Sequence, residues 1–272
     1  MDGVRYVAFV LGLAIVFALR SIPQIVSWFK NLFGKKTDAP PAETITIRGG
    51  ALTLSPVKPD RAKAEWLRRR RSTTGTSVII VEPYDHAEVK EDAADGSPDE
   101  ILSQAAEIDV TKFFADRHQN FEEDEDEDMG EDWAIAHQEP DPTKLKRAKN
   151  PFKEFAGATF EKQTYLAEIP CSAPWQVLAH FPFGGWNDVP YDHELTAVFK
   201  DWFERFGAVP ALISSDVIEF WVENPIEDPA VAAKLAMEMY ILCPDSVDQG
   251  TDTTEALANC LLGAKVWSFW WD

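Results

Sequence analysis

The sequence predicts an α+β fold, and three observations support this class. The C-terminal third alternates β-prone runs with segments whose apolar residues recur at a helical period. Hydrophobic residues make up 45% of the chain, which is typical of folded domains. The length of 272 residues allows one large domain or two ordinary ones, each able to bury a core. We therefore expect an antiparallel or mixed sheet with helices packed largely on one face.

An apolar segment opens the chain. Residues 6–19 (YVAFVLGLAIVFAL) are 14 consecutive uncharged residues. A helix of that length covers roughly 21 Å of a hydrocarbon core about 30 Å thick. The apolar character resumes after Arg20 and reaches Trp28 and Phe29, which suit a membrane interface. We expect one membrane-anchor helix within residues 6–29; a signal peptide, cleaved or not, and a buried helix of a soluble domain are the alternatives.

The basic residues around this segment predict its orientation. Arg5 alone precedes it, whereas Arg20, Lys30, Lys35 and Lys36 follow it. The positive-inside rule then places the C-terminal bulk of the chain in the cytoplasm. The 3 cysteines, an odd number in a long chain, agree with a reducing compartment.

The composition divides the chain into five parts. A membrane anchor with its basic flank precedes a Pro- and Thr-rich linker, in which the runs ETITI and ALTL allow a small hairpin. An upstream α/β subdomain follows, and an acidic linker then leads into a C-terminal α+β domain. The expected boundaries are 1–36, 37–60, 61–120, 121–150 and 151–272. The subdomain is expected to hold a helix over 61–71, a strand over 76–83 that joins the C-terminal sheet or stays separate, and helices over 97–107 and 109–120.

The net charge of −20 is unevenly distributed. Residues 121–132 (FEEDEDEDMGED) hold nine acids in twelve positions, which predicts a solvated, extended segment. Residues 171–272 hold 16 acids against 4 Lys and Arg. Such a chain repels polyanions, so we expect no nucleic-acid partner, although residues 68–71 are four consecutive arginines. We expect those arginines to complement the end of their own helix and to meet acids elsewhere in the chain.

The C-terminal domain is predicted to run strand, helix, strand, strand, helix, short helix, strand. Its first helix has the clearest signal, because six apolar residues recur at offsets 0, 3, 4, 7, 8 and 11 from Leu195. We expect Asp192 to cap this helix and Gly207 to end it. The order is close to that of a ferredoxin-like sandwich or a related topology. The predicted ranges are 175–181, 193–206, 211–214, 217–222, 229–243, 253–263 and 265–271.

Several strings in this domain carry a family resemblance. They are Phe183 to Asn187, Trp202-x-x-x-Phe206-Gly207-Ala208, Ile213-x-x-Asp216, Tyr240 to Gly250 with Cys243-Pro244-Asp245 inside it, and Trp267 to Asp272. Together they resemble a bacterial family catalogued as the domain of unknown function numbered four-two-five-three, over about residues 171–272. That family has no established activity, so the resemblance implies a fold unit of bacterial origin and no particular reaction. With the anchor, it predicts a single-pass protein of the bacterial inner membrane.

The same strings supply a candidate pocket. Cys243 would act as a nucleophile only with a histidine base, for which His193 and His180 are the candidates in this domain. Its place near a helix C-terminus and its acidic neighbours raise the pKa of the thiol, so we expect a buried structural cysteine. The candidate pocket consists of Gly184, Gly185, Trp186, Asn187, His193, Cys243, Asp245, Asp248 and Gln249.

Metal and cofactor sites have weak support in the sequence. The residues nearest to a metal-binding set match no established ligand spacing, so we expect neither a metal nor a cofactor. Gly184 and Gly185 form no phosphate loop, because no Lys or Ser/Thr follows them at the required spacing. The set considered is Asp192, His193, Asp245, Asp248 and Asp272.

The last strand carries large apolar groups on both faces. Trp267, Phe269 and Trp271 share one face of a regular strand, and Trp270 points to the other face with Val266. One face must be core, and the other is either covered by the upstream subdomain or exposed to a partner. The candidate partner surface is Trp267, Trp270, Trp271 and Asp272.

These features favour a membrane-tethered bacterial protein with a cytoplasmic, acidic, non-catalytic domain that binds a protein. An acidic domain suits a basic partner, such as a toxin. The first alternative is a hydrolase-like enzyme with a pocket around Gly184–Asn187, His193 and Asp245–Gln249, which requires those groups to converge in a cleft. The second is a membrane-associated scaffold in which the acidic run acts as a spacer.

Overall fold

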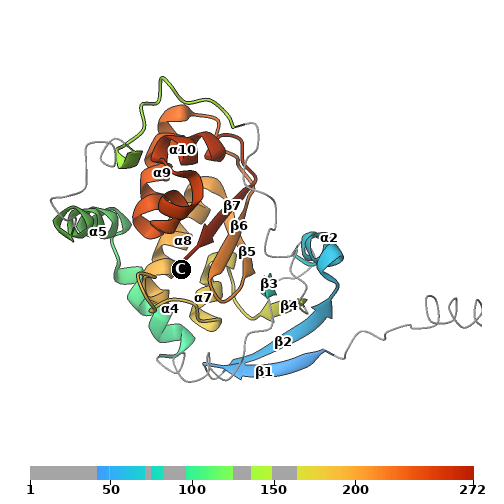
Figure 1. Ribbon diagram of the computed structural model, residues 1–272. Helices are drawn as coiled ribbons and strands as arrows, with labels where there is room; N and C mark the ends of the chain where they lie inside the picture. Colours follow the sequence, from blue (N-terminus) through green and yellow to red (C-terminus); the bar gives the residue numbers. More distant parts are fainter. Residues whose placement is uncertain (1–41, 49, 71–74, 82–95, 125–135, 149–163) are drawn as a thin grey trace, which may run out of the picture. The chain divides into compact units, whose positions relative to one another are not determined.

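A computed structural model describes residues 42–48, 50–70, 75–81, 96–124, 136–148 and 164–272 (Figure 1). Residues 41–272 form one compact unit. The strands are β1 (Glu43–Ile47), β2 (Gly50–Val57), β3 (Ser77–Val81), β4 (Thr164–Ile169), β5 (Ala208–Ile213), β6 (Val217–Val222) and β7 (Val266–Trp270). The helices are α2 (Pro59–Arg69), α4 (Pro98–Glu107), α5 (Val110–Asp124), α7 (Val177–His180), α8 (Asp192–Phe206), α9 (Pro229–Leu242) and α10 (Thr254–Leu261). Two shorter turns are η2 (Pro174–Gln176) and η3 (Ser246–Thr251).

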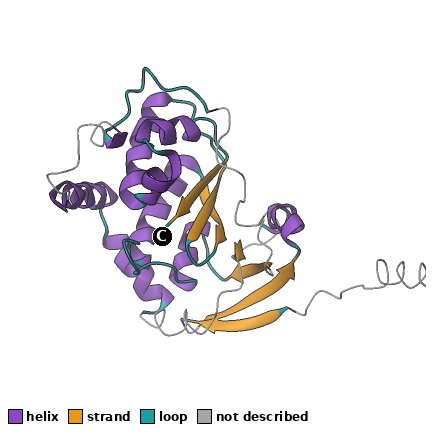
Figure 2. Ribbon diagram, in the orientation of Figure 1, coloured by secondary structure: helices purple, strands orange, loops and turns teal. Residues whose placement is uncertain are grey.

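All seven strands of the described residues belong to one mixed sheet, in the order β1-β2-β4-β3-β5-β6-β7 (Figure 2). Neighbouring strands are antiparallel except β3 and β5, which pair in parallel between Ile80–Val81 and Leu212–Ile213. The α+β class and the mixed sheet are therefore confirmed. The ferredoxin-like topology is wrong, because β5, β6 and β7 follow one another as neighbours instead of interleaving with the first strand.

The sheet also runs across the boundaries that the sequence predicts between linker, subdomain and C-terminal domain. The 37–60 segment supplies the β1–β2 hairpin, and the 61–120 segment supplies β3, which lies between β4 and β5. The strand expected over 76–83 thus joins the C-terminal sheet. These segments are one structural unit instead of a linker and two separate domains. The anchor segment 6–29 and most of the acidic run lie outside the described residues.

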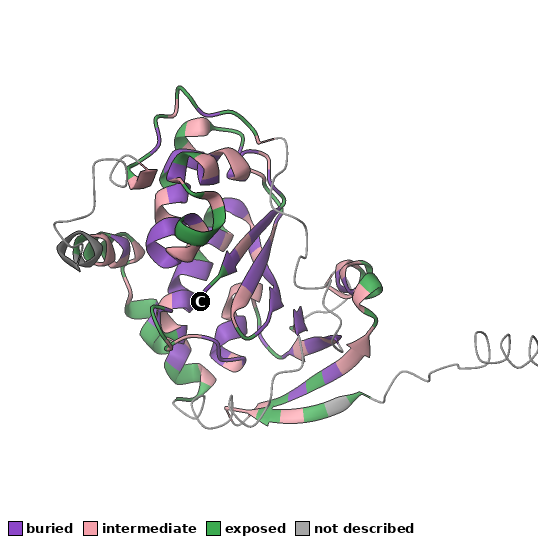
Figure 3. Ribbon diagram, viewed as in Figure 1, coloured by how far each residue is buried: buried purple, intermediate pink, exposed green. Residues whose placement is uncertain are grey.

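The first face of the sheet packs against α8 and α9 through a large hydrophobic cluster (Figure 3). Trp202 of α8 lies at its centre and is fully buried. Its ring contacts Phe220 at 5.8 Å, Trp267 at 5.7 Å and Phe269 at 5.5 Å between ring centroids. The helical period read from Leu195 onward therefore does predict a core face, and Gly207, with a φ of 63°, ends the helix as expected.

Helix α2 covers the second face of the sheet. Trp66 is buried between Val78, Ile80, Leu212 and other residues of a second, smaller cluster, and its indole Nε1 donates to Val78 O at 2.6 Å. The basic residues that follow it bond to acids, as predicted. They form the ion pairs Arg68–Glu65, Arg69–Glu65, Arg69–Glu168 and Arg70–Glu223.

Residues 174–180 are helical, in η2 and α7, so the strand predicted over 175–181 is wrong. Pro174 opens the short turn η2, and the side-chain oxygen Oε1 of Gln176 accepts from the backbone N–H groups of Ser172 and Ala173. These local bonds start a helix within an apolar run whose length alone fits a buried strand equally well. The first strand of the domain is β4 instead.

The other predicted elements are confirmed with small shifts of their ends. They are the β1–β2 hairpin, α4, α5, the β5–β6 hairpin, α9, α10 and β7. In the β5–β6 hairpin Ser214 N donates to Val217 O, so Ser215 and Asp216 make the two-residue connection that was expected. Within the described ranges, no helix is both long and apolar enough to cross a bilayer.

Candidate functional site

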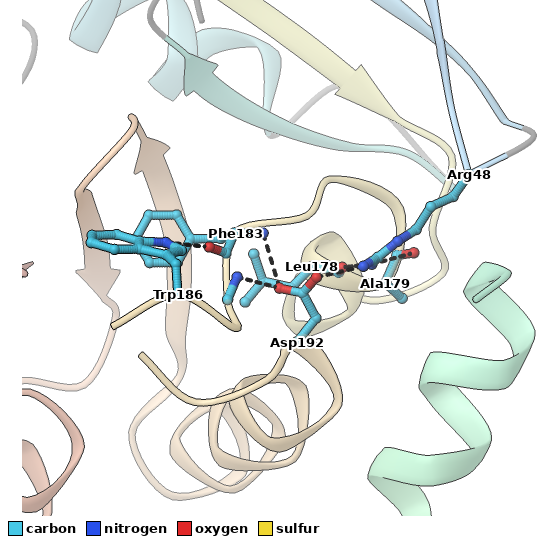
Figure 4. A network of polar contacts seen from close by, with 7 residues as sticks. Arg48, Leu178, Ala179, Phe183, Trp186 and Asp192 are labelled. Atoms are coloured by element: carbon cyan, nitrogen blue, oxygen red, sulfur yellow. Dashed lines mark hydrogen bonds and ion pairs between the residues drawn. The ribbon is translucent and has the colours of Figure 1, made fainter. Parts of the chain in front are cut away.

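Asp192 lies in a buried polar network that fixes the glycine turn (Figure 4). Its Oδ2 accepts from Arg48 Nη2 at 2.5 Å, and its Oδ1 accepts from the backbone N–H groups of Phe183 at 2.9 Å and Gly184 at 2.7 Å. Arg48 sits at the tip of the β1–β2 hairpin and also donates to Leu178 O at 2.7 Å. Both charged side chains are almost fully buried, with 4% of Arg48 and 5% of Asp192 exposed. Asp192 is therefore the first residue of α8 and not its cap, which corrects the expectation.

Burial raises the pKa of Asp192, and Arg48 together with the two backbone N–H groups opposes that rise. The same network explains Gly184, because a Cβ at this position would overlap Pro190 O. Gly185 has a φ of +89°, a conformation that side chains rarely adopt. The two glycines thus serve the close packing of a turn, which leaves Asp192 and Gly184 with structural roles.

A second network joins loops from three parts of the C-terminal domain. Asn187 Nδ2 donates to Asp272 O at 2.8 Å, and Asp272 N donates to Asp245 Oδ2 at 3.0 Å. Gln249 Nε2 then donates to Asp245 Oδ1 at 2.7 Å. The structure therefore brings Asn187, Asp245, Gln249 and Asp272 together at the end of β7. We call these four residues the loop cluster.

Cys243 lies directly behind the loop cluster but is closed off from solvent. Its side chain is fully buried, and its Sγ donates to Trp270 O at 3.0 Å. Burial raises the pKa of the thiol from its ordinary value of 9.0 to about 12. A neutral, enclosed thiol is a poor nucleophile. The structure thus agrees with the structural cysteine that the sequence predicts.

Three other members of the predicted pocket have their partners outside the loop cluster. The His193 ring stacks on Tyr191, with 5.8 Å between ring centroids. Asp248 Oδ1 lies 2.7 Å from His137 Nε2, in the segment that follows the acidic run. Trp186 packs edge-on against Phe183, at 6.1 Å, and donates from Nε1 to Phe183 O. The predicted pocket therefore separates into a glycine turn, the loop cluster and two histidine contacts.

Arg117 of α5 is a member of this region that the sequence gives no means of finding. Its Nη2 donates to Asp188 O at 2.7 Å and its Nε donates to Ile241 O at 3.1 Å. It thereby joins the loop after Asn187 to the end of α9. Burial lowers the pKa of Arg117, and the nearby carboxylates of Glu194 and Asp188 oppose that change. In the sequence Arg117 is one basic residue in an ordinary helix, and only tertiary packing gives it this position.

The predicted partner surface divides in two. Trp267 and Trp271 are buried in the main core, so they are unavailable to a partner. Trp270 is 37% exposed, and its Nε1 donates to Asp216 Oδ2 at 3.0 Å. Its neighbour on that face, Val266, is covered in the cluster around Trp66. Both predicted fates of the second face therefore occur: coverage at the start of β7 and exposure at its end.

The described part of the chain contains no group of three or more His, Cys, Asp or Glu side chains placed to hold a metal ion. The carboxylates near the end of β7 are instead bonded to backbone N–H groups, amides and an indole. These bonds tie each of the carboxylates to neighbouring groups of the same chain.

Comparison with known proteins gives one match. Residues 165–272 match the model of a family described as "Domain of unknown function (DUF4253)". This stretch is similar to DUF4253 domains. The match confirms the resemblance drawn from the Cys243-Pro244-Asp245 and Phe269 to Asp272 strings. No curated protein and no solved structure matches the chain.

The DUF4253 match covers only part of the sheet. It starts within β4 and includes β5, β6 and β7, but it omits β1, β2 and β3. It includes Asp192 and Asp188 but omits their partners Arg48 and Arg117. The glycine turn and the loop after Asn187 are thus held in part by residues outside the match.

Proposed function

We propose that this chain is a membrane-tethered bacterial protein whose DUF4253-like region lies in the cytoplasm and binds a basic protein partner without catalysis. The binding surface is the loop cluster together with Trp270, Asp188 and Asp216. Residues 6–29 serve as the anchor in the inner membrane. The partner is a protein of basic charge, for which a toxin is one example.

The observation that carries this proposal is the convergence of acids and one exposed indole at the end of β7. Asp245 and Asp272 lie in the loop cluster, and Asp216 bonds to the Trp270 indole. Arg117 uses its guanidinium on the carbonyls of Asp188 and Ile241. A partly exposed Trp that bonds to a carboxylate, at a strand end with further acids, suits a basic partner, because Trp is a frequent hot-spot residue and complementary charge guides association.

The arrangement of the predicted pocket favours binding over a hydrolase-like reaction. A nucleophile and its base must lie within hydrogen-bond reach of each other. Cys243 donates to the Trp270 carbonyl, and His193 stacks on Tyr191. The residues that do converge are those of the loop cluster, which has two side-chain amides and two aspartates. They offer acceptors to a partner.

A capture experiment from native membranes tests this surface. The full-length protein is purified with its bound partners as the wild type and as the variant Asp188→Lys/Trp270→Ser. Loss of a Trp hot spot typically costs about 2 kcal/mol, or roughly thirtyfold in affinity, and the reversed charge weakens a basic partner further. We expect one basic protein to be enriched with the wild type and depleted at least tenfold with the variant.

Glu204→Lys provides the matched control, because Glu204 lies on α8 and its side chain is 61% exposed. It makes the same kind of charge reversal away from the proposed surface, so the basic protein should remain bound. Equal recovery with Asp188→Lys/Trp270→Ser and the wild type would exclude this surface. Recovery of no basic protein by any form would exclude the partner class.

The anchor needs its own test. Alkaline carbonate should leave the full-length protein in the membrane pellet, because an inserted apolar helix resists extraction. A form lacking residues 1–36 should appear in the soluble fraction. Release of the full-length protein by carbonate would contradict the anchor while leaving the partner surface to its own experiment.

A further inference from the structure

Three cations gather around one indole on the face of the sheet covered by α2. Lys63 Nζ lies 5.9 Å from the centroid of the Trp221 ring, Arg70 Cζ lies 5.8 Å from it, and Lys265 Nζ lies 6.0 Å from it. They come from α2, from the residue after it and from the residue before β7. Cations within about 6 Å of an indole face are attracted by the ring. Trp221 is half-buried and Lys265 is exposed, so this group reaches the molecular surface.

The basic character extends along α2 and contrasts with the rest of the chain. Among the described residues, the part of this face around α2 and Trp221 holds seven basic side chains and five acidic ones, whereas the whole chain has a net charge of −20. Arg61 and Arg68 are exposed on the outer side of the helix. The basic residues are Lys58, Arg61, Lys63, Arg68, Arg69, Arg70 and Lys265, and the acidic residues are Asp60, Glu65, Glu168, Glu219 and Glu223.

The same side of the fold receives the chain from its N-terminal part. β1 begins at Glu43, which pairs with Leu54 near the end of β2. β2 ends at Val57, and α2 begins at Pro59. The point where the chain enters the sheet therefore lies beside the strand end that leads into the basic helix (Figure 1). A membrane anchor N-terminal to this point would therefore keep α2 close to the membrane surface.

We propose that the α2 face, centred on Trp221 with Arg61, Lys63 and Lys265, contacts the acidic phospholipid headgroups of the membrane that anchors the chain. This inference rests on the proposed anchor and adds an orientation to it. Lys and Arg near an acidic leaflet each contribute roughly a fivefold preference, and an indole suits the headgroup region. The effect is local, since charges are screened beyond about 8 Å at physiological salt. Acidic groups farther than that distance from the α2 face therefore do not cancel it.

Energy transfer from the protein to dye-labelled lipid measures this orientation. One fluorophore is placed on α2 through Ala64→Cys and another on α8 through Glu204→Cys, both in a Cys260→Ser background. The full-length protein is reconstituted in vesicles of phosphatidylcholine alone or with phosphatidylserine. We expect phosphatidylserine to raise transfer from position 64 and to lower transfer from position 204, and 0.5 M NaCl to remove the difference.

Charge reversal identifies the residues responsible. Arg61→Glu/Lys63→Glu/Lys265→Glu should give the same transfer in both kinds of vesicle. The matched control, Lys112→Glu/Lys144→Glu/Lys200→Glu, changes the net charge equally at exposed lysines outside the α2 face and should orient like the wild type. Equal transfer from wild-type protein in both vesicles, or unchanged orientation after reversal on the α2 face, would overturn the inference.

A second tether separates this inference from the anchor itself. Residues 41–272 contain all the described strands and both hydrophobic clusters in one compact unit, so they are expected to fold alone. An N-terminal hexahistidine on nickel-chelating lipid then holds them at the surface whether or not residues 6–29 insert. Orientation in this form with failure of the full-length chain to insert would contradict only the anchor. Absence of orientation in this form would contradict the α2 contact.

Discussion

Arg48 and Asp192 form the contact on which the glycine turn most depends. The carboxylate is buried and accepts three hydrogen bonds, of which Arg48 supplies the charged one. Arg48 also reaches the carbonyls of Leu178 and Ala179, so one side chain holds both the start of α8 and the end of α7. Removal of either partner leaves a buried charge without compensation, which costs more than the pair itself contributes.

We expect Arg48→Ala to lower the free energy of unfolding by about 3 kcal/mol, because Asp192 then stays buried without its counter-ion. Urea unfolding followed by far-UV circular dichroism measures this change. Arg68→Ala is the matched control, since its ion pair with Glu65 is exposed and should contribute less than about 1 kcal/mol. Equal losses in the two variants would contradict the role given to Arg48.

Gly184 makes a second prediction at the residue scale. A Cβ at this position would overlap the backbone oxygen of Pro190, which has no flexible end that can move away. We expect Gly184→Ala to destabilise the protein by about 3 kcal/mol, measured as a lower urea midpoint. Gly50→Ala is the control, because its nearest neighbour would be Ile47 O at an ordinary 3.5 Å. A stable Gly184→Ala protein would contradict the geometry of the turn.

The Cys243 thiol links pH to stability. Its pKa is raised from 9.0 to about 12, so the folded state retains a proton that the unfolded state loses. The resulting stability is complete below pH 9 and is lost as the pH rises toward 12. Cys243→Ala should therefore flatten the decline of the urea midpoint between pH 9 and 11.

In the folded wild-type protein at pH 8, Cys243 should resist iodoacetamide, as mass spectrometry of the digested protein can show. Rapid modification would revive the nucleophile hypothesis.

Individual residues were predictable where local chemistry decides their role. Asp228 caps α9 by accepting from Ala230 N at 2.8 Å, as Asp before Pro predicts. Cys243 was predicted as a buried thiol from its helix end and its neighbours. Asp192 also looks like a cap in sequence, but its partner Arg48 lies 144 positions away and no local pattern reveals it. The position of Arg117 depends in the same way on long-range packing.

At the scale of elements, α2 depends on one indole. Trp66 is buried, and its Nε1 donates to Val78 O, so it fixes the helix to β3. Trp66→Ala removes this bond and leaves a large cavity beneath the helix, which typically costs 3–5 kcal/mol; we expect a loss of about 4 kcal/mol. Trp270→Ala, at an exposed indole, should cost less than about 1 kcal/mol by the same urea measurement. Similar losses at both positions would contradict the packing of α2.

Elements with a long, regular pattern were predictable, and short apolar runs were not. The offsets from Leu195 identify α8 because a strand has no reason to repeat at that period. The apolar run over residues 175–181 fits a buried strand as well as a buried helix. The hydrogen bonds that the Gln176 side chain accepts start a helix there. β4, with the sequence TYLAEI, has a charged Glu168 within it and was not predicted. Glu168 faces Arg69 of α2, so a tertiary ion pair makes that residue acceptable in the strand.

At the scale of the whole molecule, the order of strands could not be read from the sequence. The pattern of elements gives the α+β class, but not that β3 separates β4 from β5. That arrangement depends on contacts between segments more than 80 residues apart, such as Ile80 with Leu212. Because β3 lies between β4 and β5, residues 165–272 contain both of these strands but lack the strand that joins them. The loop cluster forms at the far end of the sheet thus completed.

We expect the DUF4253-like region of this protein, with its proposed binding surface, to fold only together with upstream residues. Thermal unfolding of residues 41–272 and of residues 165–272, followed by circular dichroism, tests this expectation most directly. We predict one cooperative transition for residues 41–272. Residues 165–272 should show none, because without β3 the strands β4 and β5 have no common neighbour and the buried Asp192 has lost Arg48. Cooperative unfolding of residues 165–272 at a similar temperature would contradict the claim.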